Sequence, residues 1–211
     1  MSENQKLEKK IREFAQKNHW IVIGISGCTN SGKTNICQFL EKKLDPLVII
    51  HQDKFFREED DPEHIWIDLE NNKRHQNWEI VQSVDWNRML EKIYEIVQNP
   101  ANKMPSFLVI DGHIIYNYKP LREIFDQKYF IEIDDKQTIF KRRIQRDYIP
   151  PDPPGYFDQY VWPMYLKNKE DLKDQKDITM IDGSLDKESI FELILNDLGR
   201  KLFNKLKYNL S

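Results

Sequence analysis

Eight consecutive residues near the start of the chain have the types and spacing of a phosphate-binding loop. They read Gly27-Cys-Thr-Asn-Ser-Gly32-Lys33-Thr34, which matches the pattern G-x-x-x-x-G-K-[ST] in full. Glycines let such a loop curl until its backbone N–H groups converge on phosphate oxygens. Lys33 can reach the β- and γ-phosphates, and the Thr34 hydroxyl can hold Mg²⁺. We therefore expect the whole loop to bind a nucleoside triphosphate such as ATP, through Gly27, Cys28, Thr29, Asn30, Ser31, Gly32, Lys33 and Thr34.

Two carboxylates follow apolar runs that are typical of buried strands. Asp111 ends the run Phe107-Leu-Val-Ile-Asp111, the form of a Walker-B strand, whose carboxylate lies near magnesium. Asp53 follows the run 47–50 and could accept the proton of an attacking hydroxyl or bind Mg²⁺. Ligands gather at the carboxyl ends of parallel strands. The pattern predicts phosphoryl transfer with Asp53 and Lys33 as catalytic residues and with Thr34, Asp53 and Asp111 at the metal.

A short basic segment, Lys141-Arg142-Arg143-Ile144-Gln-Arg146, follows later in the chain. On a helix Arg142 and Arg146 share a face, and Arg143 is offset by about 100°. Such a run can be a solvated surface. Beside a phosphate-binding loop it can also be a mobile lid that supplies bidentate donors and excludes water. We expect a basic lid over about residues 142–160; the family resemblance described below implies that Arg142 and Arg146 contact the ATP phosphates.

The apolar periodicity indicates the elements that must position these residues. Strands are expected at 20–25, 47–50, 107–110, 129–133 and 178–181, and helices at 4–18, 33–43, 80–97 and 136–146. A final helix is expected after Asp186, a plausible N-cap, with an apolar stripe of Ile190, Ile194, Leu198 and Leu202. This alternation predicts an α/β fold with a five-stranded parallel sheet and helices on both faces.

Two stretches do not fit that alternation. Residues 57–77 are dense in charge and amide and are assigned to an irregular excursion, whereas the proline-rich and aromatic run 150–165 is expected to be rigid and partly buried. We divide the chain into an N-terminal helical extension, 1–19, and a single domain, 20–211.

Composition and charge limit the classes of partner that the chain is expected to bind. The 211 residues carry a formal net charge of -3, so they lack the broad basic field of a nucleic-acid binder. Cys28 and Cys37 have no metal-ligand spacing and are interpreted as reduced thiols. The chain begins with polar residues and has no apolar run of membrane-spanning length. We expect a cytoplasmic monomer or weak dimer that binds small molecules and neither nucleic acid nor membrane.

The sequence also resembles a known family, the nicotinamide riboside kinases. The match runs from about Ile21 to Gly183, and its most specific part is the run from Pro150 to Lys167. The other stretches that carry it are Gly24-Ile-Ser-Gly-Cys-Thr-Asn-Ser-Gly-Lys-Thr34, His51-Gln-Asp53-Lys-Phe-Phe56, Asp111-Gly112 with Tyr116-Asn-Tyr-Lys-Pro120, and Arg142-Arg143 with Tyr148. The resemblance implies a P-loop NTPase of nucleoside-monophosphate-kinase-like fold that transfers the ATP γ-phosphate to the 5′-hydroxyl of a riboside, a step of NAD salvage.

Carried over residue by residue, the resemblance implies a substrate site. Asp53 would be the proton acceptor, Phe56 and Tyr148 would sandwich the pyridine ring, and Glu79 would hold the ribose 2′- and 3′-hydroxyls. Arg143 would contact the substrate, and the segment Leu185, Asp186 and Lys187 would lie on the adenine side. The substrate-binding set is Asp53, Lys54, Phe55, Phe56, Trp78, Glu79, Arg143 and Tyr148.

Several residues depart from the family pattern. Glu79 replaces an expected Asp, Asp111 stands where Glu is common, and Lys54 occupies a position that is often acidic. The stretch 57–77 does not align well. Because nicotinic acid riboside carries an extra carboxylate, we expect Lys54 to favour that substrate.

Three other functions are compatible with a phosphate-binding loop. A uridine or cytidine kinase would share the loop and the base, but the ring-binding aromatics and residues 150–167 favour a pyridine riboside. A non-catalytic binding protein is disfavoured because Lys33, Thr34, Asp53 and Asp111 are all present. A GTPase switch would read guanine through an N-K-x-D sequence, which occurs in this chain at Asn168-Lys169-Glu170-Asp171.

Overall fold

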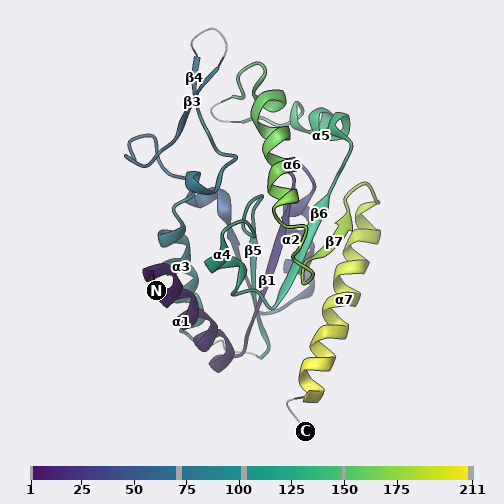
Figure 1. The fold of residues 1–211 in the computed structure, drawn as a ribbon. Helices are drawn as coiled ribbons and strands as arrows, with labels where there is room; N and C mark the ends of the chain where they lie inside the picture. Colours follow the sequence, from purple (N-terminus) through teal and green to yellow (C-terminus); the bar gives the residue numbers. More distant parts are fainter. Residues whose placement is uncertain (1, 70–72, 101–103, 149–150, 209–211) are drawn as a thin grey trace.

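The computed structural model describes residues 2–69, 73–100, 104–148 and 151–208 (Figure 1). Its centre is a five-stranded parallel sheet in the order β2-β5-β1-β6-β7. The strands are β1 (Trp20–Gly27), β2 (Leu47–His51), β5 (Ser106–Asp111), β6 (Gln127–Glu132) and β7 (Thr179–Asp182). Each predicted strand is confirmed to within a few residues.

Helices cover both faces of this sheet, as Figure 1 shows. Along β1 the side chains alternate, because successive residues of a strand point to opposite faces. Val22 joins one buried cluster and Ile23 the other. The first cluster includes residues of α1 (Glu3–Lys17), α3 (Trp86–Val97), α4 (Lys119–Arg122) and α6 (Trp162–Glu170). The second is closed by α2 (Lys33–Lys43) and α7 (Lys187–Tyr208). The result is a three-layer α/β/α arrangement.

Helix α1 is packed onto the rest of the fold. Ser2 caps it through a reciprocal capping box with Gln5, which satisfies two backbone donors that the helix would otherwise leave unpaired. Ile11 is fully buried, and the Phe14 ring meets Tyr94 of α3 edge-on at 5.6 Å. The segment therefore contributes to one of the two cores.

Two predictions in the region between β2 and β5 are wrong. The helix expected at 80–97 begins at Trp86, because Asp85 caps it by accepting a hydrogen bond from the Arg88 N–H, and residues Val81–Ser83 form a separate 3₁₀ turn, η3. The stretch 57–77 contains an antiparallel hairpin of β3 (Trp66–Leu69) and β4 (Lys73–Gln76). The charged residues of these strands obscure the apolar periodicity by which a strand is recognised. One of them, Arg74, lies over the Trp66 ring at 4.7 Å. Residues 70–72 of this stretch lie outside the described residues.

The lid region differs from expectation in its helices. Helix α5 (Lys136–Arg143) ends three residues before the predicted boundary, with Ile144 as C-cap. Pro150 lies outside the described residues. Beyond it, a π-helical turn, η4 (Phe157–Val161), leads directly into α6, in which a proline is tolerated in the first turn. Phe157, Val161 and Tyr165 are buried, which confirms that this run is partly buried.

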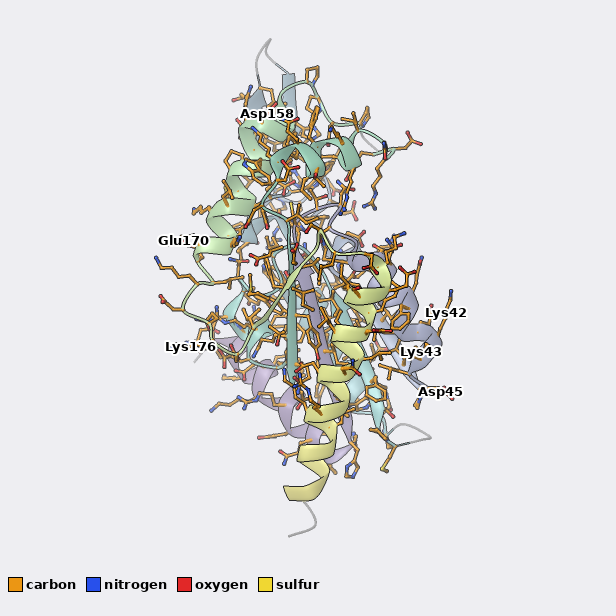
Figure 2. The ribbon with its side chains drawn as sticks, turned by 90° about the vertical axis from the view of Figure 1, so that its right-hand side faces the viewer. Lys42, Lys43, Asp45, Asp158, Glu170 and Lys176 are labelled. Atoms are coloured by element: carbon orange, nitrogen blue, oxygen red, sulfur yellow. The ribbon has the colours of Figure 1, made fainter. Side chains whose placement is uncertain are left out.

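Several charged side chains project from the surface of this fold. Figure 2 views the molecule with α7 in front and shows the side chains of Lys42, Lys43 and Glu170 projecting outward. Among the described residues, no helix combines the length and the apolar character that crossing a membrane requires.

Candidate active site

The phosphate-binding loop joins the end of β1 to the start of α2. Gly27 has φ of +135°, and a Cβ there would lie 2.2 Å from the carbonyl oxygen of Ile131 on β6. Gly32, at φ of +100°, is the left-handed N-cap of α2. Both positions therefore require glycine. The loop leaves the N-terminal end of an eleven-residue helix at the carboxyl edge of the sheet, where an anion is stabilised.

Lys33 folds back over this loop. Its Nζ donates to the carbonyl oxygens of Gly27 at 3.0 Å and Cys28 at 2.6 Å. Burial lowers the pKa of Lys33, and the neighbouring Cys28 thiol and Asp111 oppose that shift. Burial also raises the pKa of Cys28 to about 12, so this residue is a neutral thiol inside the loop. The Lys33 ammonium group is thus held by two backbone carbonyl oxygens, which it can exchange for phosphate oxygens.

The neighbouring strands β2 and β5 bring two further polar groups to the same edge. His51 and Asp111 are register partners, and His51 Nδ1 lies 2.5 Å from Asp111 Oδ1. Burial raises the pKa of Asp111; the His51 and Lys33 charges oppose this, and the nearby Asp53 carboxylate adds to it.

Asp53 follows in a single 3₁₀ turn, η1 (Gln52–Phe55). Gln52 fixes that turn, because its buried Oε1 accepts a hydrogen bond from the Ile114 N–H at 3.2 Å. A Cβ at Gly112 would lie 2.4 Å from the same oxygen, so the close approach requires glycine. Asp53 is therefore held beside the end of β5.

A second group of residues, Trp78, Glu79 and His113, forms another wall of the same cavity. Glu79 is 7 % exposed, and burial raises its pKa to about 7, although the Arg143 charge opposes the shift. His113 Nε2 lies 3.1 Å from the Trp78 carbonyl oxygen and 3.6 Å from Glu79 Oε2. Burial lowers the pKa of His113 to about 3. The imidazole is therefore neutral, and its approach to Glu79 is a dipolar contact rather than an ion pair.

Two residues of the predicted lid, Arg143 and Tyr148, contact the phosphate-binding loop. Arg143 is buried and makes a bidentate pair with Asp152, through Nε at 2.5 Å and a terminal nitrogen at 3.0 Å. Its other terminal nitrogen donates to Thr29 Oγ1 at 3.1 Å. The guanidinium of Arg143 also stacks 4.5 Å from the Tyr148 ring centre, and the Tyr148 hydroxyl lies 3.1 Å from Asn30 Nδ2. These contacts join the predicted lid segment to the phosphate-binding loop.

Loop, strand ends, second wall and lid enclose one cavity of about 500 Å³. It is lined by Thr29, Asn30, Gly32, Lys33, Thr34, Asn35, His51, Asp53, Phe56, Trp78, Glu79, Asp111, Gly112, His113, Arg142, Arg143, Arg146 and Tyr148. The lining combines a phosphate-binding loop, cationic side chains, carboxylates and aromatic rings, a set that can hold a triphosphate and an alcohol acceptor together.

Comparison with known proteins identifies the family. Nicotinamide riboside kinase 1 of Rattus norvegicus is 35% identical over 192 residues, which cover 86% of this chain and 95% of the relative. This chain belongs to the nicotinamide riboside kinase family. A uridine kinase of Ligilactobacillus salivarius matches at 25% identity over 208 residues. No family model matches the chain.

Among solved structures, a deoxyadenosine kinase from M. mycoides with bound dATP covers 85% of this chain at 18% identity, with a TM-score of 0.45. That similarity is too weak to support an inference. The fold of this riboside kinase is shown by its own sheet order and phosphate-binding loop.

Some residues predicted for the site lie away from the cavity surface. Cys28 and Ser31 are buried inside the loop. Lys54 is exposed, and its carbonyl oxygen accepts a hydrogen bond from Arg88 at 2.9 Å. Phe55 packs against the core beneath the Arg88 guanidinium. The geometry thus gives Lys54 no contact with the cavity of the kinase.

The segment from Leu185 to Lys187 lies at the carboxyl edge beside β6. Gly183, just before it, donates its N–H to the Glu132 carbonyl oxygen at 2.7 Å. Asp186 caps α7 by accepting from the Ser189 N–H at 2.9 Å, which agrees with the sequence prediction. The three residues are not among those that line the cavity.

Sequence reasoning missed several residues of the kinase site. His51, His113, Asn35 and Gly112 line the cavity, and Asp152 pairs with Arg143. His51 and His113 each stand two residues from a predicted carboxylate, Asp53 and Asp111, at the end of a strand. That spacing was a usable signal, because residues at strand ends gather at the same edge. Asp152 gave no signal of its own inside the proline-rich run.

The donor set of the kinase fits a magnesium ion. Thr34, Asp53 and Asp111 line the same cavity beside the phosphate-binding loop. Mg²⁺ prefers hard oxygen ligands and is usually held by one or two carboxylates plus substrate phosphates. The repulsion between Asp53 and the buried Asp111 would be relieved by a cation at this place.

Proposed function

We propose that this chain transfers the γ-phosphate of ATP to the 5′-hydroxyl of nicotinamide riboside, a step of pyridine nucleotide salvage. The observation that carries the proposal is a cavity of about 500 Å³ that joins a phosphate-binding loop to a buried carboxyl and aromatic rings, in a chain 35% identical to a nicotinamide riboside kinase. Kinase chemistry makes ATP the co-substrate.

On the phosphate wall, the loop binds the triphosphate through its backbone N–H groups, and Lys33 carries the charge of the β- and γ-phosphates. Arg142 and Arg146, which line the cavity from the lid, neutralise the remaining phosphate charge. Leu185, Asp186 and Lys187 lie on the adenine side. Thr34, Asp53 and Asp111 would hold Mg²⁺, which supplies charge neutralisation between the phosphates when bound.

On the acceptor wall, Glu79 receives the ribose 2′- and 3′-hydroxyls and Arg143 contacts the substrate. Phe56 and Tyr148 hold the pyridine ring, with Trp78 beside them in the same cavity. Stacking suits this substrate because nicotinamide riboside carries a flat cationic ring. Asp53 lies between the two walls and accepts the 5′-hydroxyl proton as the oxygen attacks in line.

The proposal extends to conditions of action. Cys28 and Cys37 are both free and buried, which supports a reducing, cytoplasmic compartment. The formal net charge of -3 supports small-molecule rather than nucleic-acid partners. We infer a monomer or a weak dimer.

The test is a coupled ADP-release assay with Mg·ATP against nicotinamide riboside, nicotinic acid riboside, uridine and cytidine. We expect kcat/KM on a pyridine riboside to exceed that on the pyrimidines by at least about tenfold, which corresponds to about 1.4 kcal/mol of transition-state discrimination. Higher turnover of uridine or cytidine would overturn the pyridine assignment and leave a pyrimidine nucleoside kinase. Comparable kcat/KM values for the two pyridine ribosides would show that the enzyme does not prefer nicotinic acid riboside.

A further inference from the structure

The residues Trp78 and Glu79 are held in place by hydrogen bonds to their backbone. The Glu79 N–H donates to Asn77 Oδ1 at 3.3 Å, and the Glu79 carbonyl oxygen accepts from Asn168 Nδ2 at 3.2 Å. The Trp78 carbonyl oxygen accepts from Ser83 Oγ at 3.3 Å and lies 3.1 Å from His113 Nε2. The backbone is thus fixed on both sides of Glu79.

The His113 contact also determines where the imidazole carries its hydrogen. A carbonyl oxygen can only accept, so Nε2 must be the donor to Trp78. The ring is neutral because burial depresses its pKa, which leaves Nδ1 unprotonated. Nε2 also lies 3.6 Å from Glu79 Oε2, which is beyond hydrogen-bond distance, so the imidazole edge that donates to Trp78 packs beside the Glu79 carboxyl.

A glutamate at position 79 gains more from a fixed neighbouring side chain than an aspartate would. A glutamate side chain has one more rotatable bond than aspartate, and fixing it costs additional conformational entropy. Burial further disfavours the ionised carboxylate unless nearby donors and charges offset the cost. The His113 ring lies in the cavity wall with its centre 6.0 Å from the Phe56 ring, so it packs between the sugar end and the aromatic end.

We propose that His113 is a positioning residue for the acceptor: its imidazole holds the Trp78 carbonyl by a hydrogen bond and packs beside the Glu79 carboxyl, which keeps that carboxyl in the arrangement that receives the ribose hydroxyls and so makes the enzyme prefer ribosides to deoxyribosides. This inference rests on the proposed function, in which Glu79 receives those hydroxyls. It differs from a packing role because its effect must depend on the 2′-hydroxyl of the substrate.

The experiment compares wild type, His113→Phe and His113→Gln. Phenylalanine keeps the ring and loses the donor, whereas glutamine restores an N–H near the position of Nε2. Each variant is assayed with nicotinamide riboside and its 2′-deoxy analogue, and in parallel with uridine and 2′-deoxyuridine. Binding of the four compounds is also measured by calorimetry without ATP.

For His113→Phe we expect KM for the riboside to rise about tenfold, the effect of one lost hydrogen bond, while kcat and KM for ATP change by less than about twofold. The deoxyriboside should be affected much less, so the discrimination ratio collapses toward unity. His113→Gln should restore part of it. With Glu79→Gln as the background, His113→Phe should cost little more, because His113 acts on the riboside through the Glu79 carboxyl.

His75→Phe is the matched control. His75 is also buried and meets Trp78 edge-on at 5.1 Å, but it is not one of the cavity-lining residues. Equal losses on riboside and deoxyriboside, the same change in His75→Phe, or additive effects with Glu79→Gln would each overturn the proposal.

Two further arms keep the test decisive. If His113→Phe does not fold, His113→Gln is compared with the shorter His113→Asn, and equal discrimination in the two variants counts against the proposal. If wild type uses uridine and no pyridine riboside, the proposed substrate fails, and the uridine pair still decides the role of His113.

Discussion

The two walls of the cavity are built in different ways. The phosphate wall is one contiguous segment, residues 27–34, shaped by backbone conformation and by two glycines at positive φ. The acceptor wall is assembled from side chains that lie far apart in the sequence, namely Phe56, Trp78, Glu79, His113, Arg143 and Tyr148. The phosphate wall can therefore be predicted from a short sequence pattern, whereas the acceptor wall forms only when the chain folds.

The walls also differ in how they treat charge. The phosphate wall offers backbone donors and Lys33, which suit any triphosphate. The acceptor wall buries Glu79 among groups that shift its pKa in both directions. A general anion site thus faces a site whose selectivity depends on a few desolvated side chains. Substitutions in the two walls should consequently have different substrate dependence.

The largest effect is expected where the walls meet. Asp53→Ala should lower kcat by about 10²–10⁴-fold if Asp53 accepts the 5′-hydroxyl proton. The loss should appear with every acceptor, measured by ADP release at saturating substrates. Asp53→Asn, which keeps the shape and removes the proton acceptor, should lose a similar amount. A loss below threefold in either variant would remove Asp53 from that role.

Lys33→Ala tests the phosphate wall. Removing one preorganised cation should cost about 10²–10³-fold in kcat, and the cost should be the same for all acceptors, since the lysine serves the triphosphate. The matched control is Lys42→Ala, an exposed lysine at the other end of α2 that projects away from the fold in Figure 2. Normal turnover in Lys33→Ala would contradict the phosphate-binding assignment.

Glu79→Gln tests the acceptor wall through stability. The pKa of Glu79 is raised from 4.5 to about 7 on folding, so its ionisation destabilises the folded state as the pH rises through that range. At pH 8 the variant should be more stable than wild type by up to about 3 kcal/mol, and the difference should vanish near pH 4.5. The groups that face this carboxyl are Arg143, Asp152, Lys33, Tyr156 and His113.

Urea unfolding at the two pH values measures the difference, with the exposed Glu170→Gln as control. The same Glu79 variant should bind riboside more weakly while its ATP binding is unchanged. A pH-independent stability difference would show that the buried carboxyl is not the cause.

Much of the fold could be predicted from the sequence because its signals are local. Runs such as 107–110 are apolar throughout, as strands buried on both faces must be, and all five strands were located. The hairpin at 66–76 was missed because its strands are short and carry charges that face neighbouring rings. Helix α6 was missed because a proline in its first turn resembles a loop signal.

The candidate site was predictable where its signals are local. Lys33, Thr34 and Asp111 follow from a spacing rule, whereas His113 and Asp152 gain their partners only through tertiary packing. A long-range contact such as that between Arg143 and Thr29 joins segments that no periodicity links. The sequence therefore predicts where phosphate binds more fully than how the acceptor is chosen.

The position of β1 at the centre of the sheet has a consequence for how the protein is made. The phosphate-binding loop emerges early in synthesis, but Gly27 rests on the backbone of Ile131, and β1 pairs with β5 and β6, which are made much later. Such long-range pairing forms slowly, because loop closure must precede the contacts that reward it. A nascent chain shorter than about 131 residues should therefore lack nucleotide affinity, although its loop sequence is already complete.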